Sequence, residues 1–116
     1  PDLILASDSY TIDEDYDLLS KIAPTLSYQT GVGSDDWQTQ IAQIAPLLGR
    51  SERAGRLVTT VEQQITEARK RNPEFEGKTF TGGPVLPDGT VYTINSADDA
   101  AAKMYAQLGL QLSPKV

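Results

Sequence analysis

One long amphipathic helix is the feature that most constrains how this chain folds. From Ser51 to Arg71 the sequence holds no proline, and its only glycine is Gly55 near the start. The apolar residues of this stretch recur at helical spacing and form one stripe, made of Ala54, Leu57, Val58, Val61, Ile65 and Ala68. Asn72 and Pro73 end the helix, because proline cannot continue it. At 1.5 Å per residue the helix is about 30 Å long.

The segments before and after this helix both alternate short strands with helices. The sequence therefore predicts an α/β fold, with short strands and flanking helices on either side of one connecting helix. The expected division is the end of a first lobe at residues 1–50, an inter-lobe helix at 51–72 and the start of a second lobe at 73–116.

Composition excludes several classes of function. The net charge is −6, so a nucleic-acid partner is not expected. The chain has no cysteine and no histidine, which removes thiolate chemistry, disulfides and the commonest general base. No run is apolar enough to span a membrane. No serine lies in a nucleophile elbow either, so no residue of the chain is a clear candidate for a nucleophile or a general base.

No metal site is predicted, although three acidic residues alternate as the first ligands of an EF-hand would. These residues are Asp13, Asp15 and Asp17. Leu18 stands where that loop needs glycine, and Pro24 where it needs glutamate. An acidic first turn of an ordinary helix is the favoured interpretation.

Two short strands and a helix are predicted at the start of the chain. The apolar run at residues 3–6 is typical of a strand buried on both faces of a parallel sheet. Residues 25–29 are a weaker candidate for a second strand. Between them, Thr11 and Glu14 match a capping box at the start of a helix over about 12–22.

A second helix is predicted to begin at Ser34-Asp35-Asp36, where acidic residues are favourable, and to end at Gly49. Pro46 is expected to bend this helix or end it early. Its buried face is expected to contain Trp37, Ile41, Ile44 and Leu48. Trp37 is interpreted as a core residue, with stacking on a ligand as the alternative.

After the long helix, residues 78–94 predict two strands around a turn at 87–89. Ser96 is expected to cap a final helix over 97–108, and residues 110–116 to form a tail or begin another element. The inward face of the final helix is expected to contain Ala101, Met104, Tyr105 and Leu108.

Tyr10 is the clearest candidate for ligand contact. It follows the carboxyl end of the first strand, which is where ligands bind in open α/β sheets. The alternative is that Tyr10 packs on the following helix. Gly82 and Gly83 indicate a strand bend or a close approach of the backbone to a ligand. Tyr92 faces either solvent or a cleft.

The order of these features resembles the iron-siderophore substrate-binding proteins of ABC importers, the class with a long inter-lobe helix. The resemblance covers essentially the whole chain. It is carried by the run at 1–7 followed by Tyr10, by Leu19, Ile22-Ala23-Pro24-Thr25, Trp37, Ile44-Ala45, Leu48-Gly49-Arg50 and Ala54, and by Gly77-Lys78-Thr79, Tyr105 and Leu108-Gly109-Leu110.

The resemblance implies a non-catalytic extracytoplasmic protein, periplasmic or anchored to the cell surface as a lipoprotein, in a bacterium. It would capture a ferric siderophore or related chelate, with no directly bound cofactor, and deliver it to a membrane permease. Alternatives are a structural or interaction domain, or a binder of cobalamin or haem. The resemblance also implies an internal fragment of a longer protein, which by itself is expected to self-associate.

Site residues follow from the same resemblance. Tyr10 is the expected ligand contact, with Ser9 and Asp8 as neighbours. Pro84 and Pro87 correspond to a cleft-side loop of the second lobe. The implied permease-docking residues are Asp17 and Glu14, and Asp17 stands where the family usually has glutamate.

Overall fold

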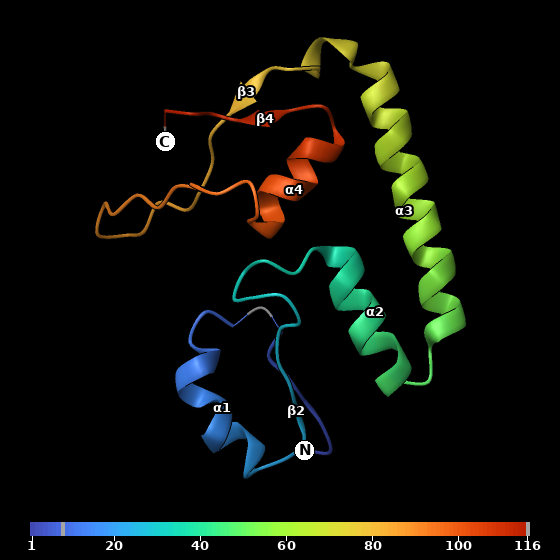
Figure 1. Cartoon of the computed structure of the whole chain (residues 1–116), viewed down its shortest axis with the longest axis vertical. Coiled ribbons are helices and arrows are strands. Elements are labelled where there is room, and N and C mark those ends of the chain that lie inside the picture. The colour runs from blue at the N-terminus through green and yellow to red at the C-terminus, as the bar shows by residue number, and fades with distance from the viewer. Residues whose placement is uncertain (8, 116) are drawn as a thin grey trace. The chain divides into compact units, whose positions relative to one another are not determined.

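The computed structural model describes residues 1–7 and 9–115, and the chain divides into two compact units, Pro1–Arg56 and Leu57–Val116. The boundary between the units falls inside the long helix α3 (Ser51–Arg71), whose bounds agree with the sequence prediction (Figure 1). The mixture of helices and short strands confirms the α/β class. The finer division into two lobes and a connecting helix stays a prediction.

In the first unit, a helix connects two parallel strands. Strand β1 (Ile4–Leu5) pairs with β2 (Thr25–Leu26), and the backbone N–H of Ile4 donates to the Pro24 carbonyl at 2.9 Å. Helix α1 (Ile12–Ser20) connects the strands and packs on β2. The predicted parallel pairing is confirmed. Burial on both faces is not observed, because Leu5 of this two-stranded sheet is 47% exposed.

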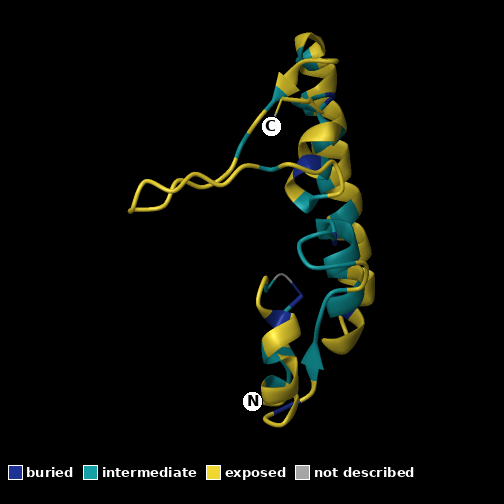
Figure 2. Cartoon of the chain, turned by 60° about the vertical axis from the view of Figure 1, so that its left-hand side comes forward, coloured by how far each residue is buried: buried dark blue, intermediate teal, exposed yellow. Residues whose placement is uncertain are grey.

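Helix α1 does not begin with the predicted capping box. The Thr11 hydroxyl donates to Asp15 Oδ2 at 2.7 Å, and no side chain caps the helix. The helix is held by Ile12, which is fully buried, whereas most of its surface is exposed (Figure 2). It also ends earlier than predicted, so Ile22 lies beyond it and is largely exposed.

Helix α2 (Trp37–Leu47) begins at the predicted acidic residues, since the Asp36 carboxylate accepts the Thr39 N–H at 2.8 Å. Pro46 does not shorten the helix, because at this position it removes only one bond of the last turn. Gly49 follows with φ +63° and ends it as predicted. The buried face differs from the prediction: Ala45 is buried, and Leu48, beyond the last turn, is exposed.

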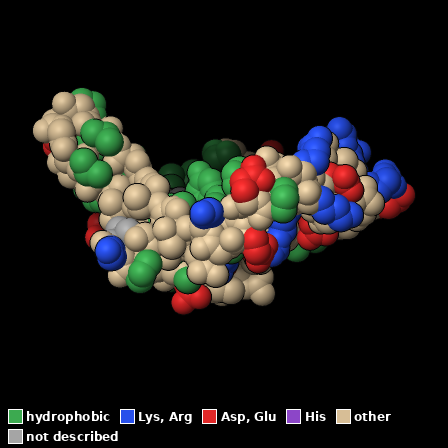
Figure 3. All heavy atoms as spheres, turned by 90° about the horizontal axis from the view of Figure 1, so that it is seen from above, with side chains coloured by type: hydrophobic (Ala, Val, Ile, Leu, Met, Phe, Trp, Pro, Cys, Tyr) green, Lys and Arg blue, Asp and Glu red, His purple; other side chains and the backbone are tan. Residues whose placement is uncertain are grey.

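The stripe of α3 is present but no described residue of this helix is buried. Its half-buried residues recur at intervals of three and four, and they are Ala54, Val58, Val61, Ile65 and Ala68. Leu57 is exposed, although the sequence predicts it in the stripe. Basic and acidic side chains intersperse along the solvated side, at the right of Figure 3, and Glu52 pairs with Arg56.

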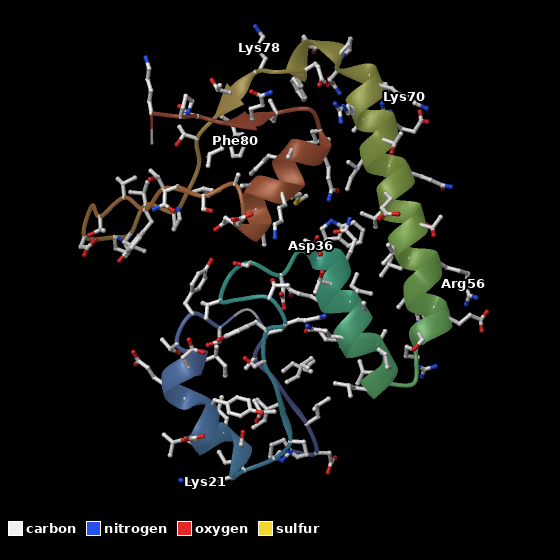
Figure 4. The ribbon with its side chains drawn as sticks, viewed as in Figure 1. Lys21, Asp36, Arg56, Lys70, Lys78 and Phe80 are labelled. Carbon is white, nitrogen blue, oxygen red and sulfur yellow. The ribbon has the colours of Figure 1, made fainter. Side chains whose placement is uncertain are left out.

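The second unit repeats the parallel arrangement. A single 3₁₀ turn (Pro73–Phe75) leads from α3 to strand β3 (Thr79–Phe80), which pairs with β4 (Gln111–Leu112). Residues 110–116 therefore include a strand, as one of the two predicted alternatives has it. Phe80, labelled in Figure 4, packs against Tyr105 of helix α4 with ring centroids 4.7 Å apart (Figure 4).

Between β3 and α4, residues 82–94 form a two-stranded antiparallel ribbon in place of the two full strands predicted. Only Val85 and Val91 make a bridge. The N–H of Tyr92 donates to the Pro84 carbonyl at 3.0 Å, and the N–H of Ile94 to the Gly82 carbonyl at 2.8 Å. The predicted turn at 87–89 closes the ribbon.

Helix α4 (Ala100–Gln107) begins later than predicted. Asp99 is its cap and accepts the Ala101 N–H at 2.8 Å, whereas Ser96 accepts the Asp98 N–H in the preceding turn. The shift changes the inward face: Ala102 is buried, and Met104 is half exposed. Three other predicted positions are exposed or half-buried, namely Ala101, Tyr105 and Leu108.

Candidate functional site

Two loops leave the carboxyl ends of β1 and β2. We call them the carboxyl-end loops, and their described residues are 6–7 and 9–11 in the first and 27–36 in the second. Because the strands are parallel, both loops leave the same edge of the sheet. One edge of the Tyr10 ring lies close to Gly33. A Cβ atom at Gly33 would be 3.0 Å from Tyr10 Cε1 and 3.2 Å from its hydroxyl oxygen. The edge of the Tyr10 ring that carries the hydroxyl is thus next to the Gly33 backbone, while 74% of the residue is exposed.

Asp35 holds the second carboxyl-end loop together. Its side chain is buried, with 2% exposed, and its carboxylate accepts the Gln29 N–H at 2.6 Å, the Thr30 N–H at 2.8 Å and the Thr30 hydroxyl at 2.6 Å. Gln43 of α2 donates to the same carboxylate at 3.4 Å. Burial raises the pKa of Asp35, but the hydrogen bonds from Thr30, Gln29 and Gln43 outweigh it, so the pKa lies below the usual value of an aspartate. Asp35 is therefore ionised at neutral pH.

A second contact anchors this loop to helix α1. The Tyr28 hydroxyl donates to Asp13 Oδ1 at 2.9 Å. The hydrogen bond to Asp13 and the charge of Asp13 raise the pKa of Tyr28 above the usual value of a tyrosine. Tyr28 thus connects the loop to α1, and Asp35 connects it to α2. Gly33, which lies near the Tyr10 ring, is between these two residues along the chain.

Alanine at Gly33 is expected to displace the Tyr10 ring. Gly33 has φ +68°, so the substitution costs about 1–2 kcal/mol in backbone strain as well as crowding the ring. Gly49→Ala is the matched control, because Gly49 has φ +63° with nothing within 4 Å of a Cβ. NMR shifts of the Tyr10 ring should change only in Gly33→Ala. Equal ring shifts in both variants would show that Tyr10 does not rest on Gly33.

The neighbours of Tyr10 contribute less. Ser9 is half-buried, and its hydroxyl lies 3.4 Å from that of Thr11. Asp8, the other predicted neighbour, lies outside the described residues. Ser7, at the end of β1, is buried. Among the described side chains of this loop, Tyr10 is therefore the large hydrophobic one that is exposed for contact with a ligand.

Pro84 and Pro87 lie in the ribbon of the second unit. The Pro84 carbonyl accepts the Tyr92 N–H, and Pro87 is the first residue of the turn. Hydrophobic side chains are exposed along the ribbon, at the left of Figure 3, and they include Val85, Leu86, Val91 and Tyr92. Pro84 and Pro87 remain predicted ligand contacts.

The predicted docking residues are on α1. Glu14 and Asp17 are both exposed on its surface, so either carboxylate is accessible to a partner. Within residues 1–7 and 9–115, no three acidic side chains gather as a group that could hold a metal ion. None of the helices in this described part is long and apolar enough to cross a membrane.

Comparison with known proteins identifies the family. Residues 1–111 match the sequence profile of the periplasmic binding proteins. The chain belongs to this family. No curated protein sequence matches the chain. The family match over residues 1–111 confirms the fold that the resemblance implies, which is part of a periplasmic-binding-protein fold.

Solved structures of this family agree closely with the chain. PiaA from Streptococcus pneumoniae TIGR4 in complex with ferrichrome is 29% identical with a TM-score of 0.72, and the match covers 98% of this chain and 39% of that one. A second PiaA structure, described as an iron uptake ABC transporter substrate-binding protein, is 28% identical with a TM-score of 0.74. The match covers 100% of this chain and 42% of that one. A periplasmic solute binding protein from Mycobacterium smegmatis is 25% identical with a TM-score of 0.70, and the match covers 97% of this chain and 40% of that one. The chain spans about two fifths of the length of these structures.

Sequence reasoning proposes Tyr10 as a ligand contact but gives no site role to two residues near it, Gly33 and Asp35. Asp35 is predicted only as part of the start of a helix. Two signals were available: the glycine pair at residues 31 and 33, and two adjacent aspartates where a helix needs one cap. Neither signal indicates on its own that Gly33 meets Tyr10.

Proposed function

We propose that this periplasmic binding protein is the substrate-binding component of an ABC importer and captures a ferric siderophore or a related iron chelate. The ferrichrome complex of PiaA carries the proposal, because PiaA is 29% identical to this chain in a match that covers 98% of this chain. Binding, without catalysis, is the function that fits an exposed aromatic ring supported by a rigid loop.

The ligand contact that we propose for the first unit is Tyr10, with Ser9 and Asp8 beside it. An aromatic ring offers a flat apolar face to the organic part of a chelate, and its hydroxyl can donate to a chelate oxygen. Pro84 and Pro87 are the contacts proposed for the second unit.

The proposed partner is a permease in the membrane, and the proposed location is outside the cytoplasm, either free or lipid-anchored. Asp17 and Glu14 are proposed to contact the permease, because both carboxylates are exposed on α1. A basic patch on the permease would complement them.

Calorimetric titration of the full-length protein with ferrichrome tests the proposal. Saturable binding with a dissociation constant of about 1 µM or tighter is expected, equivalent to about −8 kcal/mol. Iron-free ferrichrome is the matched control for the ferric form, while cobalamin and haem test the other ligand classes. Staphyloferrin B, the ligand in a SirA structure from Staphylococcus aureus with the same fold, is a second ferric chelate. Absence of saturable binding to both ferric chelates would contradict the proposal.

A further inference from the structure

The second carboxyl-end loop is fixed by one buried charge. Asp35 is 2% exposed, and three donors from residues 29–30 converge on its two carboxylate oxygens within 2.8 Å. A buried carboxylate is tolerated only when it is hydrogen-bonded, and here the bonds come from the loop itself. The loop conformation and the ionised Asp35 therefore depend on each other.

The fixed loop has a direct effect on Tyr10. Gly33 lies between Thr30 and Asp35 along the chain, and its backbone supports the Tyr10 ring. The Asp35 backbone carbonyl accepts Gln40 Nε2 at 3.1 Å, and its carboxylate accepts Gln43 Nε2 at 3.4 Å, so both parts of Asp35 are tied to α2. The position of Gly33 is thereby set relative to a helix rather than by a free loop.

We propose that Asp35 is a positioning residue, which holds residues 29–35 so that Gly33 supports the Tyr10 ring for ligand contact and thereby sets ligand affinity. The effect on affinity rests on the proposed function, whereas the effect on the loop does not. Asp35 need not touch the ligand, because its action passes through Gly33 and Tyr10.

Asp35→Asn in the full-length protein is the first test, with Asp36→Asn as its matched control. Asparagine at 35 removes the charge and places an NH₂ group against N–H donors. At position 36 asparagine caps a helix about as well as aspartate. In Asp35→Asn the amides of Gln29 and Thr30 should exchange at least about tenfold faster. Their exchange should be unchanged in Asp36→Asn.

NMR signals of the Tyr10 ring and its surroundings distinguish a positioning role of Asp35 from a merely structural one, because only the positioning role predicts that they change. Ring-current shifts of the Gly33 protons and their contacts with the Tyr10 ring should be lost in Asp35→Asn and kept in Asp36→Asn. Ferrichrome affinity should fall about tenfold in Asp35→Asn alone. If Asp35→Asn does not fold, Thr30→Val serves instead, because it removes only the 2.6 Å hydroxyl bond and should weaken affinity less.

Two results would overturn the proposal. One is unchanged amide exchange and unchanged Tyr10–Gly33 contacts in Asp35→Asn. The other is loss of those contacts with wild-type affinity for ferrichrome. If the wild-type protein binds neither ferrichrome nor staphyloferrin B, the proposed function fails separately, and the proton contacts of Gly33 alone decide whether Asp35 positions Tyr10.

Discussion

Replacing Gly83 by alanine is expected to separate the two strands of the ribbon. A Cβ atom at Gly83 would lie 1.9 Å from the carbonyl oxygen of Tyr92 and 2.7 Å from its carbonyl carbon. Both are backbone atoms, so no side-chain rotation relieves the overlap. The bonds on either side, from Tyr92 to Pro84 and from Ile94 to Gly82, should break. At about 1 kcal/mol for each bond, the cost is about 2 kcal/mol.

Gly82→Ala is the control for this prediction, because nothing lies within 4 Å of a Cβ at Gly82. Hydrogen exchange of the Tyr92 and Ile94 amides measures the outcome directly. Both amides should lose protection in Gly83→Ala and keep it in Gly82→Ala. Retained protection in Gly83→Ala would mean that the strands lie farther apart than the structure has them.

Local signals predicted the elements that depend on local chemistry. The apolar run at residues 3–6 predicts a parallel strand, and it is one. Gly49 ends α2 in the left-handed conformation that glycine adopts at little cost. Asn72-Pro73 ends α3 because proline cannot continue a helix. The two helix ends depend on chemistry within a few residues, so predicting them needs no knowledge of the tertiary structure. The strand also needs a partner from another part of the chain, residues 25–26.

Helix starts were harder to predict because several residues compete as caps. Ser96 and Asp99 are both good N-cap residues, and only Asp99 lies where its carboxylate reaches the Ala101 N–H. The Ser96 hydroxyl is used in a turn instead. Thr11 fails as a cap for a similar reason, since its hydroxyl donates to Asp15. Local sequence presents both options, and the path of the preceding loop selects one.

The candidate site was only half predictable. Tyr10 is indicated by its place after β1, because ligands of α/β sheets bind beyond the carboxyl ends of strands. Its contact with Gly33 comes from the parallel pairing of β1 and β2, which brings together loops that are separate in the sequence. Asp35 and Asp36 are identical neighbours, yet one clamps a loop and the other caps a helix. That difference depends on the direction of each side chain, which no local pattern specifies.

Loss of the Tyr10 ring is expected to lower the affinity of the full-length protein for ferrichrome without unfolding it. Tyr10 is 74% exposed, so Tyr10→Ala removes little buried surface and should leave the melting temperature nearly unchanged. One aromatic contact is worth about 1.4 kcal/mol or more, which corresponds to a tenfold or greater rise in the dissociation constant. Calorimetric titration and thermal melting of the same preparations measure both quantities.

Two further variants serve as controls. One distinguishes the contribution of the Tyr10 ring from that of its hydroxyl, and the other tests whether loss of any partly exposed tyrosine lowers affinity. Tyr10→Phe keeps the ring on Gly33 and should retain most of the affinity if the apolar face makes the contact. Tyr16→Ala removes a partly exposed tyrosine of α1 in the same unit and should leave affinity unchanged. A lower melting temperature with unchanged affinity in Tyr10→Ala would make Tyr10 a packing residue, and the ligand contact would then have to lie elsewhere in the protein.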